Sequence, residues 1–300
     1  MKKFWHETEK HNINRASANG VKKIPEEMKK NFPSLRIMTL NLRYESANDG
    51  LNSWDTNHGT GQRKEIVIDL LETYQPNIFC TQEATLSQLL FLEKSLKGYD
   101  WIGLGREGGQ KGEHTAIFYE KSYLTLQNND TFWLSRTPEK AGSKSWGATW
   151  PRIVTWACFN LENLTGPLYV FNTHFSNDSQ EARKKSAKLL RDYVNRITQE
   201  KDHVFIAGDF NTVPDKEAWK VLTGGKFNDA WLSAESRSGP GFTFHGFDGL
   251  DASEENQKRI DWIIYRSPIL KTPKKVEITP FEKGNRHPSD HFPVVLFSAN

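Results

Sequence analysis

The sequence has 300 residues, of which 36% are hydrophobic, 12% aromatic and 26% charged. This composition is typical of a globular protein with a large packed core and excludes a disordered or fibrous chain. The net charge of +3 lies well short of the concentrated cationic patch of a dedicated nucleic-acid binder. Charge alone therefore names no partner.

No apolar run approaches the ~18–20 residues of a membrane span. The basic N-terminus also lacks the apolar core of a secretory signal. We therefore expect a cytoplasmic protein with no membrane partner. The two cysteines, Cys80 and Cys158, lie in apolar runs, which predicts buried free thiols rather than a disulfide.

Residues 1–34 are rich in Lys, Asn and Glu without a steady period, and they are predicted to form an extension or partly helical tail. A partner-binding helix around residues 21–31 is the alternative. Residues 35–300 show no compositional break and are expected to form one domain.

From residue 35 onward, short runs rich in β-branched and aromatic residues recur between Gly, Pro, Asn and Asp, which is typical of strands. These predicted strands cover residues 35–42, 77–82, 114–119, 153–159, 168–174, 203–208, 260–265 and 292–297.

Helical periodicity predicts helices over 62–74, 86–97 and 179–199. Asp178 and Glu181 resemble a capping box at the start of the last helix. Two long polar connections, 43–61 and 236–258, contain aromatic residues. Connections this long within a domain are usually functional or disordered, and the aromatic residues argue against plain disorder.

Polar or titratable side chains mark six predicted strand ends. A single one is explained by turn chemistry, but a carboxylate at the end of an apolar strand is costly unless it is solvated, paired or bound to a cation. Taken together, they predict a site at one rim of the sheets. The residues are Asn41, Glu83, His174, Asp209 with Asn211, Asp261, and Asp290 with His291.

Eight motifs occur in order along the chain, and the set resembles the endonuclease/exonuclease/phosphatase superfamily of metal-dependent phosphoesterases, which have the deoxyribonuclease-I-like fold. The motifs are LNLR (40–43), QE (82–83), GE…AIFY (112–119), WPRIVTWACF (150–159), NTHF (172–175), GDFN (208–211), RIDWI (259–263) and SDHFPV (289–294). The resemblance implies an α/β (α+β) four-layer sandwich, with two mixed β-sheets packed face to face and helices on the outer sides. It makes 35–300 the catalytic domain.

The resemblance also implies a Mg²⁺ cofactor, for which Mn²⁺ may substitute. Glu83 matches the family's metal-binding glutamate, and Asn41 and Asp290 would complete or support the site. Mg²⁺ prefers hard oxygen ligands of this kind.

Five positions match the family's catalytic residues. Asp209 would orient or deprotonate the attacking water, and Asn211 would donate to a phosphoryl oxygen. His291 would face the scissile phosphate while Asp261 fixes its ring. His174 matches a second active-site histidine.

Three further residues are predicted to bind substrate or support its binding. Glu113 is the candidate to orient His174, as a glutamate does in the nuclease branch. Arg152 would contact phosphate through its guanidinium group. His245 lies in one of the long aromatic-rich connections.

Two functions from different classes stay open: a metal-dependent phosphoester hydrolase and a catalytically silent binding module on the same fold. The hydrolase would be either a phosphodiesterase or nuclease, or a phosphatase of small sugar, inositol or nucleotide phosphates. We expect a monomer whose substrate is nucleic acid or a small phosphorylated molecule. Aromatic side chains that would either stack a sugar or base or simply pack the loops are Trp133, Trp146, Trp150, Phe244 and His245.

Overall fold

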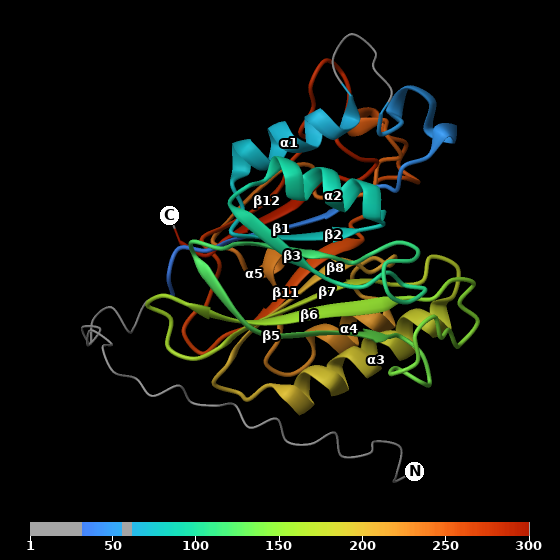
Figure 1. Cartoon of the computed structure of the whole chain (residues 1–300). Coiled ribbons are helices and arrows are strands. Elements are labelled where there is room, and N and C mark those ends of the chain that lie inside the picture. The colour runs from blue at the N-terminus through green and yellow to red at the C-terminus, as the bar shows by residue number, and fades with distance from the viewer. Residues whose placement is uncertain (1–31, 56–61, 300) are drawn as a thin grey trace.

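Two mixed β-sheets lie face to face, with helices covering their outer sides, in the computed structural model (Figure 1). The structure describes residues 32–55 and 62–299. The predicted helix around 21–31 and residues 56–61 of the first long connection lie outside the described residues.

The first sheet has seven strands, in the order β10-β12-β13-β1-β2-β4-β3. β1 pairs in parallel with β2 and antiparallel with β13, so the sheet is mixed. Its strands are β1 (Arg36–Asn41), β2 (Ile78–Gln82), β3 (Tyr99–Ile102), β4 (Ile117–Glu120), β10 (Ser236–Ser238), β12 (Lys275–Ile278) and β13 (Val294–Phe297).

The second sheet has six strands, in the order β5-β6-β7-β8-β11-β9. β7 and β8 are parallel, and β11 runs antiparallel to β8. Its strands are β5 (Leu124–Trp133), β6 (Ile153–Leu161), β7 (Leu168–His174), β8 (His203–Asp209), β9 (Asn228–Asp229) and β11 (Asp261–Arg266).

Helices α1 and α2 cover the outer face of the first sheet, and α3 and α4 cover that of the second (Figure 1). The helices are α1 (Arg63–Tyr74), α2 (Leu86–Ser95), α3 (Gln180–Ile197), α4 (Glu217–Thr223) and α5 (Ala230–Ser233), with the short 3-10 helices η2 (Ala47–Asn52) and η3 (Gly249–Asp251). No helix among the described residues is long and apolar enough to cross a membrane.

Strand β8 shows how the core is divided. Successive side chains of a strand point to opposite faces, so Phe205 and Ala207 enter the cluster between the two sheets, while Val204 and Ile206 pack under α3 and α4. The predicted four-layer sandwich is confirmed, with apolar residues filling three separate interfaces.

The sequence missed several elements and misplaced one cap. Strand β5 was not predicted because much of it is exposed and polar, as expected of an edge strand. Helix α3 is capped by Ser179, which accepts from Ala182 N, and not by Asp178 as predicted. The Asp178 carboxylate instead accepts hydrogen bonds from Ser176 Oγ and Thr149 N.

Two further expectations concern single residues. Cys80 and Cys158 are buried free thiols, as predicted. Phe32, inside the predicted extension, packs into the core between the sheets, with its ring 6.1 Å from that of Phe205. Residue 32, the first that the structure describes, is therefore already part of the packed core.

Candidate active site

The topology brings the polar strand ends to one rim. Asn41 lies opposite Gln82 at the ends of parallel strands β1 and β2. His174 lies opposite Asp209 at the ends of β7 and β8, and Asp261, the first residue of antiparallel β11, also pairs with Asp209. Strands from both sheets thus deliver their functional side chains to the same place.

The backbone around these ends is unusual. A Cβ at Gly208 would lie 2.0 Å from Thr173 O, so only glycine allows β8 to approach β7 directly before Asp209. Glu83 and Asn211, which follow β2 and β8, have left-handed φ values of 58° and 49°. Such values in non-glycine residues cluster at functional sites, where surrounding contacts hold them.

Asn41 joins the two sheets at this rim. Its Nδ2 donates to Glu83 Oε1 at 3.1 Å and to Asp209 Oδ2 at 3.0 Å. Its Oδ1 accepts from Arg43 N, and its backbone oxygen accepts from Ser289 Oγ at 2.5 Å. With three partners on its buried side chain and one on its backbone oxygen, Asn41 fixes two carboxylates relative to the segment that carries Asp290 and His291.

His291 is placed in an anionic environment. Its Nδ1 lies 2.8 Å from Asp261 Oδ2, and both side chains are buried. Burial opposes the charged imidazole, but the carboxylates of Asp261, Asp290 and Asp209 outweigh it and raise the pKa of His291 to about 10. The ring is therefore a buried cation at neutral pH, able to stabilise negative charge.

His174 is placed in the opposite environment. Arg152 Nη1 donates to His174 Nδ1 at 2.8 Å, which leaves the ring proton on Nε2, 3.3 Å from Asp209 Oδ2. The Asn211 amide lies 3.0 Å from the same Nε2. Burial and then the positive charge of Arg152 hold the pKa of His174 well below its ordinary value, so this ring is neutral.

Asp209 lies between the two histidines. Burial, followed by the negative charge of Asp261, raises the pKa of Asp209 to about 7, against the stabilising influence of His291 and Asn41. A carboxylate with a pKa near the working pH is suited to accept a proton from water.

Two groups at the rim could hold a cation. Glu83 and Asp290 have no Lys or Arg within ion-pair distance among the described residues, and burial and the charge of Glu83 raise the pKa of Asp290. Two carboxylates that raise each other's cost of ionisation, with no Lys or Arg paired to either, fit a divalent cation. Asp209, Asp261 and His291 also place ligand atoms within 4.8 Å of one another, and in the described structure Asp261 Oδ1 has no hydrogen-bond partner.

Two predicted residues, Glu113 and His245, are placed differently from expectation, and a third, Arg152, has partners within the protein. Glu113 forms an ion pair with Arg106 at 2.6 Å, and His174 is held by Arg152 instead. Arg152 also donates to Asn177 Oδ1, so two of its donors act within the protein. The His245 ring is fully buried and stacks on Phe292 with ring centroids 4.0 Å apart, so it supports the Asp290 segment from beneath.

Sequence reasoning missed Arg63, whose side chain is fully buried. It donates to the backbone oxygens of Leu42, Arg43, Asn52 and Pro288, and so ties three segments together behind Glu83 and Asp290. A signal was present, because Arg63 lies three residues before Ile66 on the apolar face of the predicted helix.

Thr243 was also missed. Its hydroxyl accepts from Ile260 N and Asp261 N, and its backbone oxygen accepts from Phe292 N at 2.7 Å. Thr243 therefore sets the distance between the segments that carry Asp261 and His291.

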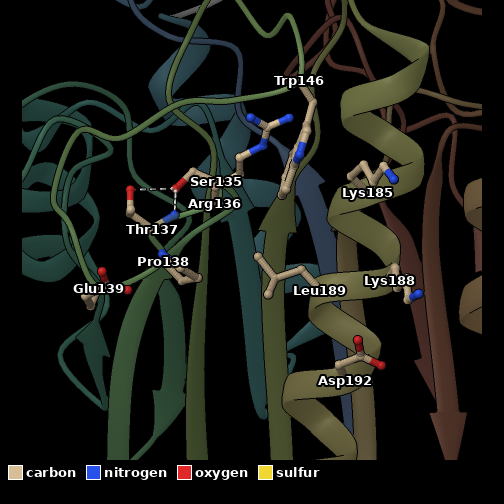
Figure 2. A pocket seen from close by; sticks show the side chains of 10 residues that line it. All are labelled: Ser135, Arg136, Thr137, Pro138, Glu139, Trp146, Lys185, Lys188, Leu189 and Asp192. Atoms are coloured by element: carbon tan, nitrogen blue, oxygen red, sulfur yellow. Dashed lines mark hydrogen bonds between the residues drawn. The ribbon is translucent and has the colours of Figure 1, made fainter. Parts of the chain in front are cut away.

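Two cavities lie near these residues. A narrow cleft beside the rim is lined by Glu83, His174, Arg152, Glu113 and Arg106, among others. A second cavity of about 340 Å³ lies between residues 135–146 and α3, and Figure 2 shows Trp146 and Arg136 facing Lys185 and Leu189 across it. Trp146, one of the aromatic candidates for stacking a sugar or base, lines this second cavity, but none of the predicted catalytic or metal-binding residues does.

A two-sheet sandwich whose rim combines buried carboxylates, an Asp–His pair and a second histidine defines a class of phosphoester hydrolases. Residues 38–291 match the Endonuclease/Exonuclease/phosphatase family. The chain belongs to this family.

Solved structures support the same assignment. The endonuclease/exonuclease/phosphatase from Bacteroides vulgatus is 31% identical with a TM-score of 0.80, over 89% of this chain and 98% of that one. The mannosyl-6-phosphatase of Bacteroides thetaiotaomicron is 31% identical with a TM-score of 0.78, over 88% of this chain and 98% of that one.

A protein of Acanthamoeba polyphaga mimivirus is 29% identical over 174 residues, which are 55% of this chain. The match spans 64% of the mimivirus protein, less than two thirds of its length.

Proposed function

We propose that the protein is a divalent-metal-dependent phosphatase that hydrolyses a small phosphorylated molecule by direct attack of water. The observation that carries the proposal is that one rim combines a buried cationic His291, bonded to Asp261, with the carboxylates of Glu83 and Asp290, neither of which has a Lys or Arg within ion-pair distance among the described residues. The charged His291 compensates negative charge on the phosphate, and the two carboxylates require a cation.

Glu83 and Asp290 would hold Mg²⁺ or Mn²⁺, with Asn41 fixing Glu83 from the side. A bound ion would offset charge on the phosphate and on the leaving oxygen. We favour this pair over the Asp209, Asp261 and His291 group because His291 Nδ1 is already bonded to Asp261 at 2.8 Å.

The chain's own residues supply the remaining steps. Asp209 accepts a proton from the attacking water, and Asn211 donates to a phosphoryl oxygen. His291 donates to the oxygen on which negative charge builds. Arg152 keeps His174 neutral and retains other N–H donors for phosphate.

A small substrate is supported by the likeness to the mannosyl-6-phosphatase over most of both chains. The charges of the cleft beside the rim point the same way, because its two arginines already bond Glu113 and His174, while Glu83 has no Lys or Arg within ion-pair distance among the described residues. Acidic side chains there disfavour a continuing phosphodiester strand. A panel of substrates that includes DNA and RNA must exclude the alternative that the protein is a nuclease.

The test is hydrolysis of bis-p-nitrophenyl phosphate, hexose phosphates, inositol phosphates, nucleotides, DNA and RNA, before and after removal of metal with EDTA. We expect activity on a hexose phosphate that EDTA abolishes and Mg²⁺ or Mn²⁺ restores. Asp209→Ala should lose at least about 10²-fold in kcat. Glu83→Gln should raise the metal concentration needed for half-maximal activity more than Asp261→Asn does.

Three results would each overturn a part of this proposal. Activity that is insensitive to EDTA would refute the metal dependence. A stronger effect of Asp261→Asn than of Glu83→Gln on metal activation would place the metal at the Asp209, Asp261 and His291 group instead. Absence of hydrolysis of every substrate, with metal supplied, would leave the silent binding module.

A further inference from the structure

Trp150 is exposed beside the active site. It is the only aromatic residue among the large hydrophobic side chains that are mostly exposed in residues 32–55 and 62–299, with 50% of its surface accessible. It lies two residues before Arg152, which holds His174. A single exposed apolar residue needs no explanation. The surroundings of Trp150 therefore decide whether it binds a ligand.

Arg106 holds the Trp150 ring and retains a free donor. Its guanidinium carbon lies 5.1 Å from the Trp150 ring centroid, and its Nη1 donates to Glu113 Oε2 at 2.6 Å. Its backbone oxygen accepts from Trp133 Nε1. Arg106 Nε is buried without a hydrogen-bond partner in the described structure, and an unused buried donor is costly unless a ligand satisfies it.

Arg106 and Glu113 also reach the reaction centre. Both line the narrow cleft that is bounded at its other end by Glu83 and His174. Trp150 contacts Arg106, which lines this cleft. The Trp150 indole, the Arg106 guanidinium and the Glu113 carboxylate therefore lie next to the place where phosphate would bind.

We propose that Trp150, Arg106 and Glu113 form the subsite for the leaving group of the substrate, and that this group is a sugar ring. The C–H face of the ring would pack on the indole. Sugar hydroxyls would donate to the Glu113 carboxylate and accept from Arg106 Nε. This inference rests on the proposed function and assigns its substrate class.

A nucleobase would also stack on an exposed indole. The charges at the cleft favour the sugar, because its arginines, Arg106 and Arg152, already bond Glu113 and His174, and the Glu83 carboxylate is left to repel the phosphates on either side of a base in a nucleic-acid strand. Neutral hydroxyl groups carry no such cost.

The test compares Trp150→Ala with the unchanged protein on two phosphomonoesters, mannose 6-phosphate and ethyl phosphate, which lacks a ring. We expect KM for mannose 6-phosphate to rise about 10-fold, corresponding to the ~1.4 kcal/mol of one good stacking contact. Turnover of ethyl phosphate should stay within about two-fold, and Trp150→Phe should restore most of the affinity. Leu90→Ala, an equally exposed position on α2, is the matched control.

A binding measurement separates the subsite from the reaction. Calorimetric titration of mannose 6-phosphate into Asp209→Ala, with and without Trp150→Ala, should show weaker binding only when the indole is absent. That result supports the subsite even if neither phosphomonoester is turned over, in which case the proposed function alone fails. Equal binding by both proteins, or a loss confined to single-stranded oligonucleotides, would refute the sugar subsite.

Discussion

The rim of the sandwich has an enclosed side and an open side. The enclosed side, formed by Asn41, Asp209, Asp261 and His291 with the half-buried Asp290, is held by hydrogen bonds between buried groups from both sheets. The open side, formed by residues 134–151, is largely exposed and joins α3 through Ser179 and Asp178. Residues whose charges must be fixed are buried, while residues that meet variable substrates are exposed.

The two histidines express this difference in their charge. His291, on the enclosed side, is surrounded by carboxylates and is cationic. His174 faces Arg152, the residue that follows the open segment, and is neutral. Opposite neighbours therefore give one residue type two roles within a single site.

The largest expected effect is on the enclosed side. His291→Ala removes the cation facing the phosphate and should lower kcat by about 10²–10³-fold, the range measured for loss of one donor to a developing oxyanion. Steady-state kinetics on bis-p-nitrophenyl phosphate with Mg²⁺ measures it. His203→Asn is the control, because this buried histidine begins β8 at the end opposite Asp209. A similar loss of kcat in both variants would contradict a special role for His291.

The next effect is on stability. Arg63→Met leaves the backbone oxygens of Leu42, Arg43 and Pro288 without their buried donor. We expect the free energy of unfolding to fall by about 3–5 kcal/mol, as when one partner of a buried charged network is removed. Urea unfolding followed by fluorescence measures it. The neighbouring Lys64→Met, whose partner Asp55 is exposed, should change stability by less than about 1 kcal/mol; equal losses would show that the enclosed side does not depend on Arg63.

Much of the fold was predictable because period-2 runs of β-branched residues between turn residues are a local signal. All eight motifs carry residues that converge at the rim or line the cleft beside it, since their order along the chain determines which strand ends meet. Edge strand β5 was not predictable in this way, because its exposed residues carry no apolar pattern.

The supporting contacts were harder to predict. Thr243 and Arg63 act through backbone oxygens and amides that are distant in sequence, and no residue pattern specifies such partners. His245 was assigned to substrate from its place in an aromatic-rich connection, yet its ring is buried against Phe292. Loop composition does not reveal which side chains face inward.

A smaller effect tests whether the enclosed side depends on Thr243 for position. Thr243→Val keeps the shape but leaves Ile260 N and Asp261 N without their acceptor. We expect kcat to fall about 10-fold with little change in KM, because a misplaced Asp261 orients His291 poorly. Thr243→Ser should restore kcat.

Thr198→Val is the matched control for Thr243. It removes a buried hydroxyl that accepts from Arg266 at the end of α3. Comparable destabilisation with unchanged kcat is expected there. Failure of Thr243→Ser to restore kcat would mean that the methyl packing, and not the hydroxyl, is what positions the pair.

The smallest effect concerns the link between the open side and α3. Hydrogen bonds from Ser176 and Thr149 lower the pKa of Asp178 to about 2. A carboxyl pKa depressed by folding stabilises the protein above the unfolded pKa of about 4, and this contribution is lost as the pH falls through the folded value. The stability difference between the unchanged protein and Asp178→Asn should therefore be constant from pH 5 to 7 and close between about pH 4 and 2.

Urea unfolding across this pH range measures the difference, which should stay below that at Arg63 because Asp178 is exposed. Glu254→Gln, another exposed carboxylate, should show no such closure. A difference that persists below pH 2 would mean that Asp178 holds the open segment by packing, not by its charge. The open side would then be held in place by packing, although it is more exposed than the enclosed side.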